Sequence, residues 1–312
     1  SILGDIHSLN PKLDRITLTG GEPLNEIDRV LKIAQFAKSL NIRVRLVTRG
    51  WDLNKELCTL LKEAGVTRLQ IGLDSSGNSS YLDSNNTTWD TYHSWLRAEK
   101  NSFQKTVDSI KSAVSSGLNV SVRYSACKSN LNDIVNTYRF VSELGVSKFK
   151  FRLLFPDGRA KNSLAKELLK GEDLAKAQLE LIRATERTKT EVEITQPCFF
   201  KLRGKTLKNV NGYNAYKQAC SCGTFAAYID SNGDIKYCLF DEKTLGNLFE
   251  KPFLKIWNSQ STNMVRETRC PFDQSGFTCS SFKILYEQHR SYEQFMKEYY
   301  REYQKNLEFL PA

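Results

Sequence analysis

Short apolar runs alternate with longer amphipathic segments along residues 1–155. The short runs are rich in β-branched and aromatic residues, as buried strands are, and they span residues 15–19, 42–48, 67–73, 118–125 and 148–155. Strands that are separated by single helices pair in parallel through right-handed crossovers. The pattern therefore predicts a series of βα units.

The segments between these runs have the spacing of amphipathic helices. In the first of them the apolar positions are Val30, Ile33, Ala34, Ala37 and Leu40. Asn41 and Gly65 stand where two helices should end in a left-handed backbone conformation, and Asp52 stands where the second helix should be capped. Residues 162–187 are expected to form a polar connector rich in helix.

Parallel strands with single covering helices form either a doubly wound sheet or a TIM-like barrel, and we expect an α/β fold with a partial barrel. Ligands bind such folds at the C-terminal ends of the strands. The segment 77–101 interrupts the βα rhythm and is expected to cover that edge. We divide the chain into a βα core (1–187), a smaller cysteine-rich α+β module (188–285) and a C-terminal helix (286–312).

The formal net charge is +10, which could attract an acidic partner such as RNA or a carboxylate-rich peptide. Lys and Arg are nevertheless spread along helical segments without a block of five or six like charges, a pattern more typical of a solvated surface. No apolar run reaches the roughly 18 residues that a membrane span needs. Residues 1–10 also lack the features of a signal peptide. We expect a cytoplasmic protein, with no membrane or nucleic acid among its partners.

The chain holds eight cysteines but no secretion signal, which favours metal or redox chemistry over a disulfide framework. Only Cys58 and Cys127 lie in the first half. The others lie in the C-terminal part, at Cys198, Cys220, Cys222, Cys238, Cys270 and Cys279. This distribution points to a metal centre in the second module.

The sequence Gly20-Gly21-Glu22-Pro23 follows the first predicted strand directly. Two residues without side chains let a ligand approach the backbone, and Glu22 can receive a cation. Taken alone, the motif is equally compatible with a tight βα turn that is capped by a carboxylate.

Residues 15–160 resemble the radical S-adenosylmethionine (SAM) superfamily. The resemblance rests on the run ITLTGGEPLNEIDRVLKIAQFAKSLNIRVRLVTRGWDL, followed by LQIGLDSS, LNVSVRYSACKSN and FRLLFPDGRA in the family's order. It implies that Gly20, Gly21 and Glu22, with Pro23 in the same loop, bind the amino group of SAM. It also implies that Ser75 contacts SAM and that Arg97 binds its carboxylate, while an ordinary exposed arginine remains the alternative for Arg97.

The family holds its SAM-binding [4Fe–4S] cluster with a CxxxCxxC loop upstream of GGEP, and no such sequence occurs in these 312 residues. We expect the natural protein to extend upstream and to carry the motif there. The SAM-binding cluster is accordingly expected only with that segment, and this chain alone is expected not to cleave SAM.

The C-terminal run CGTFAAYIDSNGDIKYC places a hairpin turn, SNGD, between Cys222 and Cys238. With LGN, IW and CPFDQSGFTC further on, it resembles the SPASM or twitch module of radical SAM enzymes. The resemblance implies one auxiliary [4Fe–4S] cluster on Cys222, Cys238, Cys270 and Cys279, with Cys220 and Cys198 as alternates. Spacing alone leaves a structural zinc site with four cysteine ligands as the alternative.

Cys127 follows a predicted strand on the expected active face, and some radical enzymes use such a thiol as a hydrogen-atom donor. A buried thiol that acts only as a small apolar group is the alternative. The three histidines, His7, His93 and His289, form no ligand pattern and are expected to be structural or exposed.

The resemblance implies a radical SAM oxidoreductase or maturase that takes electrons from a donor such as flavodoxin or ferredoxin. Modification of a peptide or protein is the first substrate class, and a dehydrogenase of small sugar-like molecules is the second. A basic, zinc-stabilised nucleic-acid-binding protein is the alternative from another class. Such a module would not need the βα series or the GGEP loop.

Overall fold

A sheet of seven parallel strands forms the frame of the molecule, in the order β1-β2-β3-β6-β7-β8-β9. The computed structural model describes residues 2–9, 13–155, 165–185, 188–194, 213–215, 226–238, 243–267 and 291–306. The strands are β1 (Arg15–Leu18), β2 (Arg43–Thr48), β3 (Val66–Gly72), β6 (Asn119–Ala126), β7 (Lys148–Leu153), β8 (Glu191–Ile194) and β9 (Tyr213–Ala215). The expected partial TIM-like barrel is confirmed.

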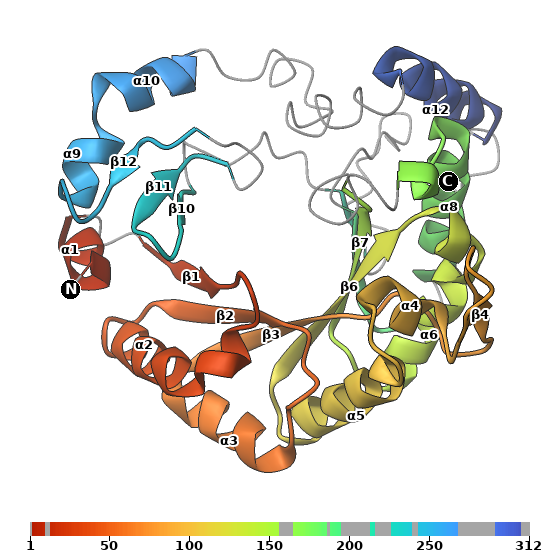
Figure 1. Cartoon of the computed structure of the whole chain (residues 1–312), viewed down its shortest axis with the longest axis horizontal. Helices are drawn as coiled ribbons and strands as arrows, with labels where there is room; N and C mark the ends of the chain where they lie inside the picture. The colour runs from red at the N-terminus through yellow and green to blue at the C-terminus, as the bar shows by residue number, and fades with distance from the viewer. Residues whose placement is uncertain are drawn as a thin grey trace.

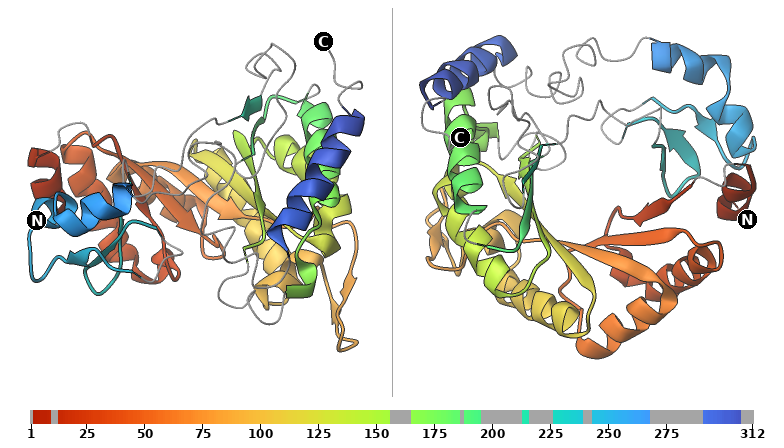
Figure 2. Two further views of the ribbon diagram at one scale, coloured as in Figure 1. Left: turned by 90° about the horizontal axis from the view of Figure 1, so that it is seen from above. Right: turned by 180° about the vertical axis from the view of Figure 1, so that it is seen from behind.

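Helices cover the outer side of this curved sheet, and the two ends of the chain lie on opposite arms of an open ring (Figures 1 and 2). The helices of the core are α1 (Ile2–Leu9), α2 (Ile27–Ser39), α3 (Lys55–Ala64), α5 (Ser102–Ser115), α6 (Ile134–Glu143) and α8 (Gly171–Ala184). Asn41 and Gly65 have φ angles of 56° and 108°, so both predicted left-handed helix ends are confirmed. The predicted cap at Asp52 is wrong, because Asn54 caps α3 by accepting a hydrogen bond from Leu57 N at 2.8 Å.

The two faces of the sheet differ in chemistry. Side chains that point toward the helices are fully buried and apolar, as Leu46, Leu69, Val122, Tyr124 and Phe151 are. The alternate residues of the same strands face the inside of the ring, and many of them are charged. The strands therefore follow a period of two, although parallel strands are commonly apolar on both faces.

The sheet continues past residue 187, where we expected the core to end. Strand β8 pairs with β7 through Phe149↔Val192 and Phe151↔Ile194, and β9 pairs with β8. The helix expected within the connector 162–187 is present as α8, but the polar character expected of this segment is wrong, because Leu174 and Leu181 of α8 are fully buried. Strand β8 was missed in the sequence because its alternating sequence, EVEI, is short and half charged.

The segment 77–101 contributes a hairpin of β4 (Tyr81–Leu82) and β5 (Thr88–Trp89), and then helix α4 (Tyr92–Arg97). Thr91 caps α4 by accepting a hydrogen bond from Ser94 N at 3.2 Å. Helix α4 lies beside α5 at one end of the sheet. The insertion is therefore a folded part of the strand-end edge, with Arg97 in its last turn.

The C-terminal module contains a small antiparallel sheet of β10 (Tyr228–Ile229), β11 (Asp234–Lys236) and β12 (Gly246–Asn247), and helices α9 (Phe253–Trp257) and α10 (Gln260–Glu267). The predicted SNGD turn is confirmed, with Asp230 Oδ1 accepting hydrogen bonds from the backbone of Asn232 and Asp234. Gly233 has a φ of 80° in this turn. Helix α9 contacts α1 (Figure 1), so this module lies against the first arm of the ring.

The expected C-terminal helix is α12 (Tyr292–Asn306), which packs along α8 on the second arm. Gly171 N donates a hydrogen bond to Glu298 Oε2 at 3.2 Å, and the Tyr299 hydroxyl donates to Gln178 Oε1 at 2.6 Å. Phe295 and Tyr299 are fully buried in the main core. Among the described helices, none is long and apolar enough to cross a membrane.

Gly171→Ala tests this close helix contact. A Cβ at position 171 would lie 1.8 Å from Phe295 O and 2.6 Å from Tyr299 N. Because backbone atoms block it, α12 must move away, and we expect unfolding free energy to fall by about 1–3 kcal/mol in urea titrations. Exchange of the α12 amide hydrogens should also accelerate. Lys170→Ala, at an exposed neighbour, is the matched control and should change stability by about 0.5 kcal/mol at most. Equal stability of the two variants would contradict the packing.

Candidate functional site

The first βα loop holds Glu22 in a fixed position at the C-terminal end of β1. Its Oε2 accepts a hydrogen bond from Arg49 N at 2.8 Å, and its Oε1 accepts from Leu24 N at 3.1 Å and from the Thr48 hydroxyl. The side chain is only 8% exposed. A carboxylate can accept about four hydrogen bonds, and three fixed donors hold Glu22. Arg49 Nε lies 3.7 Å from Oε2 as an ion-pair partner, beyond hydrogen-bond distance, so Glu22 can still accept one further donor.

The two glycines before Glu22 leave the backbone of this loop uncovered. Gly20 and Gly21 are exposed and have φ angles of 91° and 42°, in the region that side chains disfavour. An added Cβ at either position would have no neighbour within 4 Å. The loop therefore needs glycine for its conformation, and the space beside it is open to a ligand.

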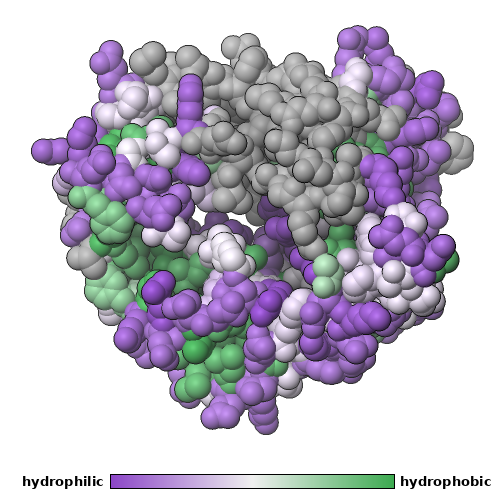
Figure 3. Space-filling model, viewed as in Figure 1, coloured by the Kyte–Doolittle hydropathy of each residue, from purple (hydrophilic) through white to green (hydrophobic). Residues whose placement is uncertain are grey.

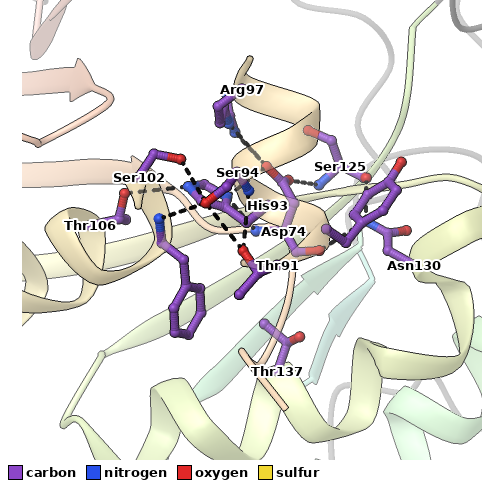
Figure 4. A network of polar contacts seen from close by, with 12 residues as sticks. Asp74, Thr91, His93, Ser94, Arg97, Ser102, Thr106, Ser125, Asn130 and Thr137 are labelled. Atoms are coloured by element: carbon purple, nitrogen blue, oxygen red, sulfur yellow. Dashed lines mark hydrogen bonds and ion pairs between the residues drawn. The ribbon is translucent and has the colours of Figure 1, made fainter. Parts of the chain in front are cut away.

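Asp74 is the centre of a buried polar network at the end of β3 (Figure 4). Its Oδ2 accepts hydrogen bonds from Arg97 Nε at 3.1 Å and Nη2 at 2.7 Å, and its Oδ1 accepts from Ser125 N at 2.8 Å. Burial alone would raise the pKa of Asp74, but Arg97, His93 and the Ser125 amide outweigh it and hold this pKa far below its usual range. Asp74 is therefore an ionised carboxylate that fixes Arg97 at the strand edge.

Arg97 reaches this position because Gly72 has no side chain. A Cβ at Gly72 would lie 2.3 Å from Arg97 Nη2. The Arg97 side chain is 29% exposed, and Nη1 makes none of its contacts to Asp74. The guanidinium is thus held on one side and open on the other, so it can receive an anion.

His93 supports the same carboxylate from helix α4. Its Nδ1 lies 3.2 Å from Asp74 N and 3.3 Å from Asp74 Oδ2, while Nε2 lies 3.3 Å from the Thr106 hydroxyl. Burial lowers the pKa of His93, although Asp74 opposes this effect. His93 is fully buried, so the expectation of a structural histidine is confirmed.

Ser75, next to Asp74, carries a buried hydroxyl that has no hydrogen-bond partner in the described structure. The residue is 5% exposed. Buried polar groups in native proteins nearly always have partners, and a ligand is one explanation for an exception. Trp51 Nε1 and Arg49 Nε also lack hydrogen-bond partners among the described residues, although Arg49 Nε lies 3.7 Å from Glu22 Oε2 as an ion pair.

Cys127 lies at the end of β6 but inside a packed cluster. It is fully buried, its Sγ lies 2.7 Å from the Tyr92 hydroxyl, and its thiol donates to Asn130 Oδ1 at 3.3 Å. Burial raises the pKa of Cys127 well above the usual value, so the group is a neutral thiol. The rings of Tyr92, Tyr81 and Trp95 contact one another edge-on or tilted in the same apolar cluster. Its role as a hydrogen-atom donor stays a prediction.

Of the proposed cluster ligands, the structure describes Cys238, which is 4% exposed and follows β11. Cys198, Cys220, Cys222, Cys270 and Cys279 lie outside the described residues. The LGN segment supports the hairpin, because Asn247 Nδ2 donates to Asp234 Oδ1 and Asn232 O, both at 2.9 Å. Gly246 leaves room for Ile256, which would lie 3.1 Å from an added Cβ.

Sequence reasoning missed two parts of this site. Asp74 was placed at a strand end without a role, although an acidic residue directly after a buried strand is a signal for one. The charged residues on the inner face of β6, β7 and β8 were not recognised as a group. Their signal is the alternation of Lys, Arg and Glu with apolar residues in VSVRYSA, KFKFRL and EVEI.

Solved structures of low sequence identity share this fold. Native anSMEcpe with bound AdoMet matches with a TM-score of 0.66 at 13% identity, covering 99% of this chain and 88% of that chain. Streptococcus suis SuiB bound to S-adenosylmethionine matches with a TM-score of 0.60 at 15% identity, covering 91% and 63%.

Curated relatives match most of the chain. AdoMet-dependent heme synthases of Methanosarcina barkeri and Oleidesulfovibrio alaskensis are 26% and 22% identical over 84% of this chain. The sporulation killing factor maturation protein SkfB of Bacillus subtilis is 22% identical over 77% of it. The chain spans 72%, 66% and 52% of the lengths of these three relatives.

Two family models match in the order expected from the sequence. The radical SAM superfamily model matches residues 2–141, and the SPASM model, an iron–sulfur cluster-binding domain, matches residues 220–280. The second match supports iron–sulfur chemistry over the zinc alternative. The chain belongs to the radical SAM superfamily and carries a C-terminal SPASM domain.

Proposed function

We propose that Gly20, Gly21, Glu22, Ser75 and Arg97 form the SAM-binding site of this enzyme, with Pro23 closing the glycine loop. One observation carries the proposal. At one edge of the sheet, the fixed Glu22 carboxylate can accept a further hydrogen bond, the Ser75 hydroxyl has no described partner, and the Arg97 guanidinium is exposed on one side. SAM has an ammonium and a carboxylate in its methionine part, and the donor set suits both. SAM held beside a reduced [4Fe–4S] cluster would supply the radical chemistry that removes a hydrogen atom from a substrate, with the electron coming from that cluster.

The chain's own residues bind and orient this ligand. Glu22 receives the ammonium group, and the exposed backbone at Gly20 and Gly21 lies beside it. Arg97 receives the carboxylate while Asp74 fixes the direction of the guanidinium. Preorganised groups of this kind reduce the entropy lost when the ligand binds.

We further propose one auxiliary [4Fe–4S] cluster on Cys222, Cys238, Cys270 and Cys279, with Cys220 and Cys198 as alternates. The buried position of Cys238 beside the hairpin and the SPASM match support this ligand set. Four thiolates saturate a [4Fe–4S] cluster. Such a cluster exchanges electrons with the substrate or with a donor such as flavodoxin or ferredoxin.

We also retain the division into a barrel core, an auxiliary-cluster module and a C-terminal helix. Because β8 and β9 belong to the barrel sheet, the core in this proposal extends past residue 187 to about residue 215. The C-terminal helix binds back onto the core through α8, so it serves as part of the barrel's outer layer.

Two substrate classes have support. SuiB has been solved bound to the precursor peptide SuiA, and SkfB is named as a maturation protein, which supports the peptide class expected from the sequence. The heme synthase of Methanosarcina barkeri matches at 26% identity over 84% of the chain, against 22% over 77% for SkfB, which supports a small molecule. We favour a small-molecule substrate for this reason.

Glu22→Gln tests the SAM site. The neutral amide loses the charge-assisted contact to the ammonium group, worth about 1.5–3 kcal/mol, so we expect SAM affinity to fall by about 10–150-fold. The measurement is equilibrium dialysis of labelled SAM against anaerobically reconstituted protein. Glu26→Gln, at an exposed carboxylate in the same turn that pairs with Arg29 at 3.5 Å, is the control. Equal SAM affinity in both variants would refute the role of Glu22.

Gly72→Ala tests whether Arg97 acts from its observed position. The added methyl group overlaps Arg97 Nη2, and a flexible side chain yields before the strand does. We expect about tenfold weaker SAM binding with little loss of stability. In a double-mutant cycle, Gly72→Ala should have little further effect once Arg97 is Gln. Additive effects of the two changes would show that Gly72 acts independently of Arg97.

Joint replacement of Cys222 and Cys238 by Ala tests the auxiliary cluster. Removing two of four thiolates should abolish cluster assembly, so we expect iron bound by the chain to fall from about four atoms to near zero. Cys58→Ala is the control, because Cys58 is fully buried in the α3 core, where burial raises its pKa to about 11. Retention of iron by the double variant, or its loss in Cys58→Ala, would refute the ligand set.

A further inference from the structure

The inner face of the barrel carries four basic side chains on β2, β6 and β7, which we call the basic wall: Arg45, Arg123, Lys150 and Arg152. The strand register puts them on one face. Arg123 is paired with Gly72 on one side and Lys150 on the other, while Arg45 is paired with Arg68. Strands lie about 4.8 Å apart and alternate residues about 6.6 Å apart, so Arg123, Lys150 and Arg152 crowd together on adjacent strands. Arg45 is separated from β6 by β3 and interacts electrostatically with Arg152.

The wall has few countercharges. Glu193 lies 3.3 Å from both Lys148 and Lys150, and so it is shared between two lysines. In the part of the chain that the structure describes, Arg45, Arg123 and Arg152 have no carboxylate within 4.0 Å. The Nε of Arg152 is buried and has no hydrogen-bond partner. Three guanidinium groups therefore face the inside of the ring with unused donors.

This arrangement is costly for the protein alone. Burial, together with Arg152 and Arg97, lowers the pKa of Arg123 to about 10 although Asp74 opposes it, and burial lowers the pKa of Lys150 to about 8 although Glu193 opposes it. Burial, Arg15 and Arg152 also lower the pKa of Arg45, against the opposing effect of Glu193. Clustered, poorly compensated charges in a sheltered position are characteristic of binding sites. An anion bound between them would remove the repulsion.

The wall is continuous with the proposed SAM site. Gly72 lies between Arg123 on β6 and the guanidinium of Arg97, so a row of cations crosses the sheet from Arg97 through Arg123 to Lys150. Figure 3 shows a hollow near the centre of the molecule that hydrophilic residues border in part. A substrate held on the wall would lie next to the ligand that starts the reaction.

We propose that the basic wall binds the substrate through at least two carboxylate groups, and that the substrate is a compact polycarboxylate molecule. Each guanidinium can bind a carboxylate with two parallel hydrogen bonds, and three of them have unused donors. The closeness of Arg123 and Arg152 on adjacent strands requires carboxylates that are equally close, which a compact molecule provides. The inference rests on the proposed function, because it takes the inside of the barrel as the substrate site.

Isothermal titration calorimetry of the 312-residue chain tests this inference without SAM or an assembled cluster. The probes are benzene-1,2,4,5-tetracarboxylate and benzoate, which share a ring but differ in charge. We expect the tetracarboxylate to bind at least about tenfold more tightly than benzoate, with affinity falling as salt is added. Equal affinities for the two probes would overturn the inference.

Two variants locate the binding. Arg123→Gln and Arg152→Gln should each weaken tetracarboxylate binding about tenfold. Arg139→Gln removes the same charge from an exposed position on α6 and should change affinity by at most about twofold. An equal loss of tetracarboxylate affinity in all three variants would mean that binding depends only on the net charge of the protein. That result would contradict a specific site on the basic wall.

Stability and a peptide probe complete the test. Because Arg123 is destabilised by its neighbours, Arg123→Gln should not lower the melting temperature, which separates lost binding from lost folding. Tighter binding of hexaglutamate than of the tetracarboxylate would overturn the compact substrate in favour of an acidic peptide. SAM binding is measured independently, so a chain that binds SAM but no tetracarboxylate would fail this inference alone.

Discussion

The buried ion pair between Asp74 and Arg97 joins the insertion to the barrel. Asp74 ends a central strand, and Arg97 ends a helix that belongs to a different unit of the chain. The carboxylate is fully buried, so it depends on Arg97, His93 and the Ser125 amide for compensation. Removing one partner of such a pair typically costs about 3–5 kcal/mol, because the other charge stays buried. The pair therefore fixes helix α4 against the end of β3, where Ser75 follows Asp74.

The two faces of the sheet have different roles, because one face supplies the apolar core and the other carries the charged side chains. Toward the helices, residues such as Leu46, Val122 and Phe151 are fully buried and supply the apolar core. Toward the inside of the ring, the same strands place Arg45, Arg123 and Lys150. Because successive side chains alternate, one strand can serve both purposes without a compromise in either. The electrostatic repulsion among the crowded basic side chains is confined to the inner face, where a bound anion would offset it.

Much of the core could be predicted from the sequence because its patterns are local. The bounds of the five expected strands differ by at most two residues from those of β1, β2, β3, β6 and β7. The prediction succeeds because β-branched runs and Gly or Asn at helix ends reflect local backbone conformation. The GGEP loop was found for the same reason. Strand β8 was missed because EVEI is short and draws its stability from pairing with β7, which no local pattern shows. Tertiary pairing also made α8 a buried helix of the core.

The site residues differ in the same way. Arg97 was identified only through a resemblance, and nothing in its local sequence shows that Asp74 lies beside it, 23 positions earlier. The inner charges of β6 and β7 are visible in the sequence as an alternating pattern, but their shared surface requires the strand register. A pattern thus gives the face on which a residue lies, while the register gives its neighbours.

The role of Gly72 can be recognised only from the residues that surround it in the fold. In the sequence it is one glycine at the end of a strand, without a motif around it. In the fold, its missing side chain admits the guanidinium of Arg97, and its register partner is Arg123. A side chain at this position would separate the cation proposed to bind SAM from the cations proposed to bind the substrate. The two proposed sites therefore adjoin because Gly72 has no side chain, so a molecule held at one would lie beside a ligand held at the other.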